Sequence, residues 1–303
     1  MENKESSLTS LVSAFSRAYH VNEDQPIIFN DTIAQCLLTN DEYSSISHNM
    51  VQGIQFFSPE MAEKLKGNDS AILKWVNQIQ LSPTPLARAA YAEQVVTSEI
   101  KLGAEQYVIL GAGLDTFAWR HPNPDIAIFE VDHPSTQQFK LQRLQQANLG
   151  HPDNLTFVAM DFTKELSLKK LRASGFDPNK KTVFTLLGVT YYLTKDLLQQ
   201  LLGTLFKDLP KGSSVIFDVA DEQLFTELGI YNRVQNMIQM AAASGEPMKF
   251  STTLPELELL LASEQLFVFE HLAPQDIQNQ YFSDREDDLQ AFETVHYIHA
   301  VKN

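Results

Sequence analysis

The spacing of apolar residues changes near residue 103 and divides the chain into two kinds of pattern. In residues 1–102 apolar side chains such as Leu11 and Phe15 recur at helical spacing. From residue 103 onward, short apolar runs alternate with amphipathic segments, as in a parallel sheet covered by helices on both faces. We therefore expect one integrated domain, with a helical cap at 1–102, an α/β core at 103–303 and a helical insertion at about 221–262.

Seven apolar runs of strand length define the expected sheet. They lie at 107–110, 126–131, 155–158, 182–187, 214–219, 266–269 and 294–301. The last two are expected to pair antiparallel at one edge, which gives a mostly parallel seven-stranded sheet. Capping-box spacing from Thr253 to Glu256 predicts a helix start. Thr84 followed by Pro85 predicts another, with Arg88 in the first turn.

Composition narrows the function classes. The formal charge of −15 disfavours binding to nucleic acid or to anionic lipid. Cys36 is the only cysteine, so no internal disulfide is expected and a reducing, cytoplasmic compartment is the simpler interpretation. The longest mostly apolar stretch, 182–193, is too short to span a bilayer. We expect no nucleic-acid partner and no membrane partner.

A glycine-rich turn follows the first strand. The run YVILGAGLDT places Gly111 and Gly113 directly after apolar residues, where glycine permits a tight turn and close approach of a ligand. A helix is expected to follow, with its first amides facing that ligand. A dinucleotide fingerprint would have a third glycine where this chain has Thr116, so the match to that fingerprint is partial.

Acidic residues follow the next two strands. Asp132 lies 19 residues after Gly113, at a position where a carboxylate accepts hydrogen bonds from both ribose hydroxyls. Asp161 and Phe162 follow the third strand, where the acid suits an adenine amino group and the ring suits the base. Each feature alone also fits a structural turn, a helix cap or a loop acid. Together they predict a nucleoside-containing ligand at the carboxyl ends of the strands.

Four ordered motifs resemble those of the leucine carboxyl methyltransferase family, a branch of the class I S-adenosylmethionine-dependent methyltransferases. The likeness is greatest to its bacterial members. The resemblance implies a Rossmann-like class I methyltransferase fold and S-adenosyl-L-methionine as cofactor. The motifs are GAGLDTFAWR at 111–120, FEVDHP at 129–134, VAMDF at 158–162 and LGVTYYL at 187–193.

The resemblance also implies roles for individual residues. Arg88 would bind the cofactor's carboxylate, a group that a guanidinium holds bidentately. Gly111 would lie beside the methionine part, Asp132 would hold the ribose, and Asp161 with Phe162 would hold the adenine.

Two arginines have structural alternatives to these roles. Arg17, in a Ser-Arg pair near the start, would reach the cofactor or the substrate carboxylate from the cap; it also suits the surface of an amphipathic helix. Arg88 could instead pair with an acid such as Glu93.

The acceptor side is less defined. A carboxylate acceptor is already ionised at pH 7 and needs no base, whereas a hydroxyl acceptor needs one. Tyr191 and Tyr192 follow the fourth strand and are candidates to line the pocket and bond the acceptor, or else core aromatics. Phosphatase-directed relatives tend to have Glu-Gly where this chain has Leu187-Gly188, which argues against phosphatase methylation. We expect O-methylation of a small or medium-sized molecule within the family's range, including secondary metabolites, with no metal.

Two other functions share parts of this pattern. An NAD-dependent oxidoreductase would use the same sheet, glycines and Asp132, but it would call for the third glycine and would not call for Arg88. A non-catalytic S-adenosylmethionine-binding protein would use the same binding residues throughout. The Met-rich insertion is typical of core or of a dimer surface, so a homodimer stays open.

Overall fold

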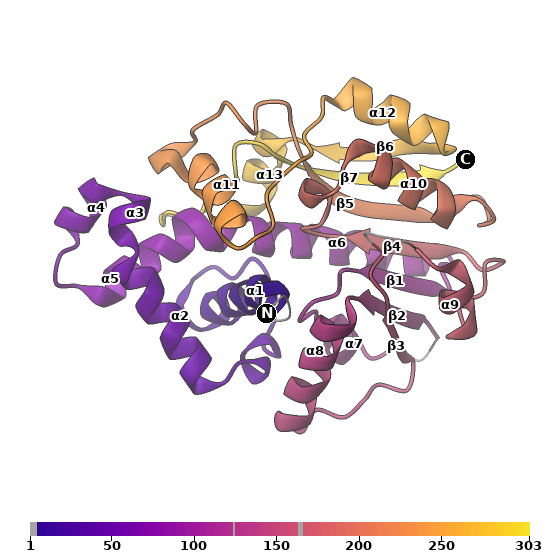
Figure 1. Ribbon diagram of the computed structural model, residues 1–303, viewed down its shortest axis with the longest axis horizontal. Coiled ribbons are helices and arrows are strands. Elements are labelled where there is room, and N and C mark those ends of the chain that lie inside the picture. The colour runs from indigo at the N-terminus through magenta and orange to yellow at the C-terminus, as the bar shows by residue number, and fades with distance from the viewer. Residues whose placement is uncertain (1–4, 124, 163–165) are drawn as a thin grey trace.

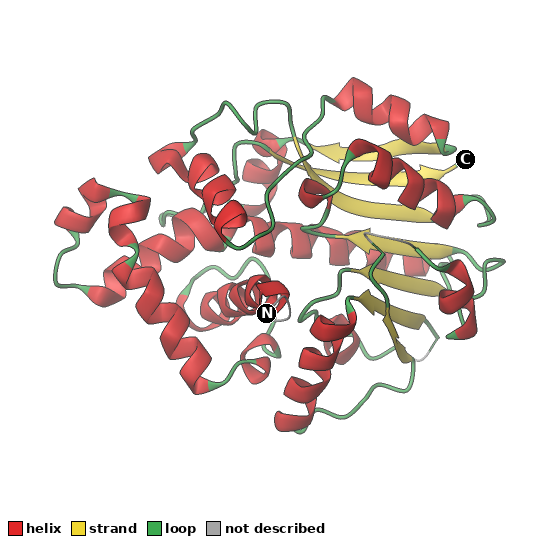
Figure 2. Ribbon diagram, viewed as in Figure 1, coloured by secondary structure: helices red, strands yellow, loops and turns green. Residues whose placement is uncertain are grey.

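A seven-stranded sheet forms the centre of the protein in a computed structural model that describes residues 5–123, 125–162 and 166–303 (Figures 1 and 2). The strand order is β3-β2-β1-β4-β5-β7-β6. The first five strands are parallel, and β7 runs antiparallel to both β5 and β6. The bounds are β1 Gln106–Leu110, β2 Ala127–Asp132, β3 Leu155–Ala159, β4 Thr182–Leu186, β5 Ser214–Ala220, β6 Leu266–Leu272 and β7 Val295–Lys302.

Helices cover both faces of this sheet, as the alternating pattern predicts. Because neighbouring side chains of a strand point to opposite faces, Tyr107 and Val108 belong to different core clusters. Apolar residues of α6 (Pro83–Lys101), α11 (Arg233–Ala243) and α13 (Pro274–Tyr281) pack on the first face. Those of α9 (Leu168–Ala173), α10 (Lys195–Phe206) and α12 (Leu254–Ser263) pack on the second. The predicted fold class, a mostly parallel sheet with an antiparallel edge, is confirmed.

The described residues before α6 are mostly helical and gather beside the sheet, where they run from indigo to purple in Figure 1. Their bounds are α1 Glu5–Glu23, η1 Ala34–Leu37, α2 Asn40–Gln52, α3 Ile54–Phe57, α4 Pro59–Lys64, α5 Asp69–Val76 and η2 Asn77–Leu81. The remaining elements are α7 Phe117–Arg120, α8 Pro134–Gln146, η3 Thr190–Tyr192 and η4 Ile230–Asn232. No helix in the described ranges has the length and apolarity needed to cross a membrane.

Sequence patterns at helix starts predicted one start correctly and two incorrectly. Thr253 and Glu256 form the predicted capping box. Helix α6 begins at Pro83, before Thr84, because the π-helical turn η2 runs directly into it, and Arg88 therefore lies in the second turn. The helix expected directly after Gly113 is absent: the chain stays irregular until α7 begins at Phe117.

Candidate functional site

A cavity of about 160 Å³ opens at the carboxyl ends of β1 and β4. It is lined by residues of α1, by Phe29 of the loop after α1, by the first turns of α6, and by the ends of the two strands with the loops that follow them. Arg17, Arg88, Gly111 and Gly113 are all among the lining residues. The fold therefore brings the two predicted arginines and the glycine turn together, although they are distant in sequence.

The glycine turn leaves no room for side chains at either glycine. Gly111 has a φ of +75°, and a Cβ there would lie 2.8 Å from Val189 Cγ2. Gly113 has a φ of +50°, and a Cβ would lie 2.8 Å from the Ser10 hydroxyl on α1. Left-handed backbone and close packing thus both require glycine here. The turn brings the backbone against the neighbouring loops, as a ligand-cradling turn requires.

Asp132, at the end of β2, holds this turn by hydrogen bonds. The Gly113 amide donates to Asp132 Oδ2 at 2.5 Å, and the His133 amide donates to Oδ1 at 2.6 Å. Burial raises the pKa of Asp132, against the two amides, which lower it. Because one amide goes to this carboxylate, the turn presents fewer free amides to a ligand than the sequence predicts. Each carboxylate oxygen still has a lone pair left for a hydroxyl.

Phe162 packs against the same turn from the neighbouring loop. Its Cζ lies 3.7 Å from the position of a Cβ on Gly111, and its side chain is buried. Asp161 precedes it and is partly buried. Asp132 pairs in register with Ala159, two residues before Asp161, so both acids leave the sheet at the same edge. The predicted nucleoside-binding residues are therefore neighbours along the carboxyl ends of β1, β2 and β3.

Arg88 reaches the cavity from α6 and is fixed by a buried acid. Its Nη1 donates to Asp218 Oδ2 at 3.0 Å, and its side chain is 19% exposed. A Cβ on Gly188, whose φ is +69°, would lie 2.6 Å from Arg88 Nη1, so the guanidinium rests directly on that glycine. Burial works to lower the pKa of Arg88, but the combined effect of Asp218, Tyr191 and Tyr297 raises it above its usual value. The guanidinium is thus a fixed cation at the cavity wall.

Asp218 is the residue of this site that the sequence interpretation missed. It is fully buried on β5, and three groups donate to its carboxylate: Arg88 Nη1, the Tyr191 hydroxyl at 3.0 Å and the Gly188 amide at 2.6 Å. A buried carboxylate is stable only with such partners. The one sequence signal for it is an acid inside the otherwise apolar run SVIFDV.

The two tyrosines predicted for the acceptor side have different surroundings. Tyr191 is buried, its hydroxyl donates to Asp218, and burial raises the pKa of that hydroxyl well above its usual value. Tyr192 is partly exposed, and burial followed by the charge of Glu246 raises its pKa to about 12. Neither hydroxyl is therefore ionised near neutral pH. Tyr191 belongs to the Arg88–Asp218 network.

Arg17 fastens α1 to the glycine turn. Its guanidinium forms an ion pair with buried Asp31 and donates to the Leu114 carbonyl at 2.8 Å. Asp31 also accepts a hydrogen bond from the Thr116 hydroxyl at 2.8 Å. Thr116 is the residue that stands where a dinucleotide fingerprint has its third glycine. The pairing of Arg17 with Asp31 was not predicted. It makes the cap helix and the glycine turn one connected unit.

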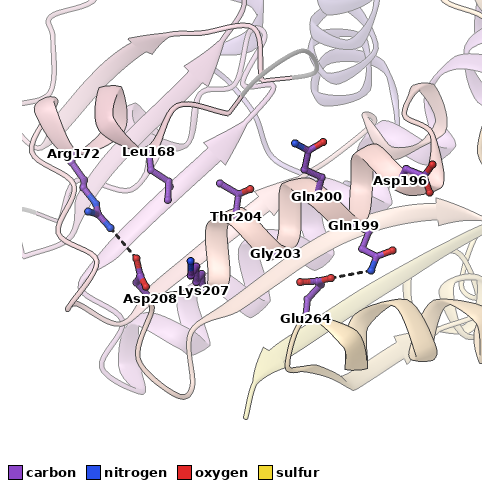
Figure 3. A pocket seen from close by; sticks show the side chains of 10 residues that line it. All are labelled: Leu168, Arg172, Asp196, Gln199, Gln200, Gly203, Thr204, Lys207, Asp208 and Glu264. Atoms are coloured by element: carbon purple, nitrogen blue, oxygen red, sulfur yellow. Dashed lines mark hydrogen bonds and ion pairs between the residues drawn. The ribbon is translucent and has the colours of Figure 1, made fainter.

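A larger hollow of about 760 Å³ lies along the outer side of α10 (Figure 3). It is lined by polar and charged residues, among them the Arg172–Asp208 pair, whose side chains are 45% and 54% exposed. Ion pairs this exposed contribute little, and they are typical of solvated surface. Size alone therefore does not identify the site. Over the described residues, no cluster of three or more His, Cys, Asp or Glu is placed to hold a metal ion.

Comparisons with known proteins identify the family of this chain. Residues 10–206 match the family model described as leucine carboxyl methyltransferase. The chain is 57% identical over 304 residues, covering 100% of both sequences, to a Bacillus subtilis protein named "Putative S-adenosyl-L-methionine-dependent methyltransferase YktD".

Solved structures show the same fold at low sequence identity. A DUF574 family protein from Streptomyces avermitilis has a TM-score of 0.54 at 16% identity, over 82% of this chain and 90% of the other. A Thermobifida fusca protein described as a "putative methyltransferase" has a TM-score of 0.51 at 17% identity, over 78% and 88%. The family match spans the cap, the glycine turn and the loop after β4. The chain belongs to the leucine carboxyl methyltransferase family.

Proposed function

We propose that this chain is an S-adenosyl-L-methionine-dependent methyltransferase that methylates an oxygen, most simply a carboxylate, of a small or medium-sized molecule. The observation that carries the proposal is the fixed Arg88 cation beside the glycine turn, with Asp132 and Asp161 on the adjoining loops. A cofactor with a carboxylate at one end and a nucleoside at the other matches this order of groups. When bound, that cofactor supplies an activated methyl group on a sulfonium.

The residues present fit such a cofactor. Gly111 and Gly188 both line the cavity, and a Cβ would lie 2.8 Å from Val189 at the first position and 2.6 Å from Arg88 at the second, so only glycine keeps these two side chains in place. Arg88 would hold the cofactor carboxylate by charge-assisted hydrogen bonds. Asp132 would accept from the ribose hydroxyls, and Asp161 with Phe162 would hold the adenine. Because Arg17 is engaged by Asp31 and Leu114, we propose that it acts by positioning the glycine turn.

The size of the cavity implies a movement on binding. Its volume of about 160 Å³ lies below the roughly 300–1,000 Å³ typical of ligand pockets. Thr9, Ser10 and Ser13 of α1 form one wall, and Ser10 touches the glycine turn. We propose that this part of α1 withdraws to admit the cofactor and then excludes water from the reaction.

The chemistry of the two tyrosines favours a carboxylate acceptor. A hydroxyl acceptor needs a general base with a pKa near neutral, whereas both Tyr191 and Tyr192 have raised pKa values. A carboxylate is already ionised, so the protein has only to align it with the methyl group. Tyr192, which is partly exposed, remains the candidate to donate a hydrogen bond to the acceptor.

Titration calorimetry tests the cofactor assignment. The purified protein should bind S-adenosylmethionine and S-adenosylhomocysteine but not NADH. Affinity for NADH without affinity for the sulfonium compound would favour an oxidoreductase and overturn the proposal. Incubation with methyl-labelled cofactor and matched panels of carboxylic acids and alcohols should then label the acids. Tight cofactor binding without turnover on either panel would instead indicate a non-catalytic binding protein.

A further inference from the structure

A second hollow also lies where parallel strands end, here at the carboxyl end of β5, but on the other face of the sheet. Its volume is about 360 Å³, between the loop after β5, the start of α12 and the ends of β6 and β7. His296 pairs in register with Val219, whereas Tyr297 pairs with Asp218. Successive side chains of a strand alternate between faces, so His296 and Asp218 point to opposite sides. This hollow is therefore separate from the cavity that holds Arg88.

Three side chains in this hollow form a hydrogen-bonded chain. His271 Nε2 lies 2.7 Å from His296 Nδ1, and His296 Nε2 lies 3.3 Å from Asp221 Oδ2. The two imidazole planes differ by 5° with centroids 5.0 Å apart, so the rings meet edge to edge in nearly one plane. Asp221 is oriented in turn by the Gln223 amide, which donates to Oδ1 at 2.9 Å. A base, its partner and an orienting carboxylate are the elements of a proton relay.

The hydrogen bonds among Asp221, His296 and His271 determine which ring nitrogen of His271 has no protein partner when both imidazoles are neutral. An ionised carboxylate only accepts, so His296 Nε2 carries the hydrogen and its Nδ1 accepts. His271 Nε2 must then donate to His296, which leaves a lone pair on His271 Nδ1. Within the described residues no protein group donates to that nitrogen. His271, which is half-buried and lines the hollow, thus carries an acceptor nitrogen within a residue that a ligand there would touch.

The surroundings of this acceptor favour a positively charged ligand. Burial and the neighbouring His296 lower the pKa of His271, which keeps it uncharged at neutral pH, while Asp276 of α13 and Glu258 of α12 act in the opposite direction. Asp221 and Glu222 add negative charge at the rim. An anion would be repelled by these carboxylates. The floor is apolar and includes Val219, Leu257 and Ile298.

We propose that the Asp221–His296–His271 chain is a second ligand site, which binds a small apolar molecule through a protonated amine. The ammonium would donate to His271 Nδ1 and lie near the rim carboxylates, while the apolar body would cover the floor. This site is independent of the methyl-transfer proposal, because it shares no lining residue with the cofactor cavity.

A matched series of ligands tests the proposed chemistry: benzylamine, benzyl alcohol and benzoate share one apolar body. Binding is followed by NMR of histidine side-chain nitrogens in the full-length protein. Benzylamine should shift the His271 signals and bind at least tenfold more tightly than benzyl alcohol, and benzoate should not bind. Equal binding of benzoate and benzylamine, or no shift at His271 with any of the three, would refute the site.

Variants and pH give a second readout. His271→Ala and Asp221→Asn should each weaken benzylamine binding about tenfold or more, while exposed His48→Ala should not. Unchanged thermal unfolding of all three variants would verify the fold. Benzylamine affinity should fall as the pH drops and His271 takes up a proton, because His271 Nδ1 then becomes a donor. Affinity unchanged by both site variants and by acid would contradict the proposal.

Discussion

Replacement of Gly188 by alanine tests whether Arg88 is positioned by the loop after β4. The new Cβ would lie 2.6 Å from Arg88 Nη1, 2.7 Å from Nη2 and 2.9 Å from Cζ. These atoms are the far end of a flexible side chain, so the arginine moves and the backbone stays. Folding should lose about 1–2 kcal/mol for alanine at a left-handed φ, and more because the displaced guanidinium leaves buried Asp218 with one partner fewer.

The effect on cofactor binding should be larger and separable. A displaced guanidinium loses its bond to Asp218 and its alignment with the cofactor carboxylate. A hydrogen bond to a charged group contributes about 1.5–3 kcal/mol, which corresponds to a loss of roughly 10- to 100-fold in affinity. Calorimetry with S-adenosylhomocysteine measures that loss, and thermal unfolding measures the cost to the fold.

Gly103 supplies the matched control. It lies just after α6, the helix of Arg88, with a φ of +93° and no atom within 4 Å of its Cβ position. Gly103→Ala should therefore destabilise the fold only by the cost of alanine at a left-handed φ, less than Gly188→Ala does, and leave cofactor affinity unchanged. Equal affinity losses in the two variants, or none in Gly188→Ala, would refute the positioning of Arg88 by this loop.

Four further outcomes are expected. Asp132→Ala should weaken cofactor binding by about 1–3 kcal/mol, seen by calorimetry, because a charged acceptor for the ribose is lost. Asp218→Asn should reduce S-adenosylhomocysteine affinity about tenfold but leave 5′-methylthioadenosine, which has no carboxylate, unaffected. S-adenosylhomocysteine should slow amide exchange in the first turns of α1, measured by mass spectrometry, if that segment closes over the cavity. Burial raises the pKa of Glu130 to about 7 despite its ion pair with Lys140, so the folded state binds this proton more tightly than the unfolded state. The free energy of unfolding should therefore fall as the pH rises from about 4.5 to 7. Denaturant titrations should show a smaller pH dependence for Glu130→Gln.

The sheet and the loop acids could be predicted because each depends on a short stretch of sequence. Alternating apolar runs defined all seven strands, and the late pair met antiparallel at the edge as expected. Gly111 follows β1 directly, Asp132 ends β2 and Asp161 comes two residues after β3, so the strand pattern alone places them at one edge. Their roles in cofactor binding stay predictions.

The partners of the arginines could not be predicted, because they depend on tertiary contacts. Asp218 lies 130 residues from Arg88, and only the packing of α6 on β5 joins them. The helix expected after Gly113 is absent because side-chain hydrogen bonds hold this segment in a loop. The Gly113 amide donates to Asp132, and the Thr116 hydroxyl donates to Asp31. Propensity and spacing carry no information about such competing bonds.

The pair His271 and His296 shows the same limit. The two residues are 25 positions apart, and the antiparallel edge of β6 and β7 brings their rings together. A β-bulge between Val268 and Glu270 shifts the register just before His271. A bulge reorients the side chains that follow it, and the sequence pattern did not predict this bulge.

A crystal structure with S-adenosylhomocysteine tests the central claim most directly. The account predicts the ligand carboxylate on Arg88, the ribose hydroxyls on Asp132 and the adenine between Asp161 and Phe162, with Arg88 still bonded to Asp218. Ligand bound away from the carboxyl ends of β1 and β2, or bound there without contact to Arg88 and Asp132, would contradict it.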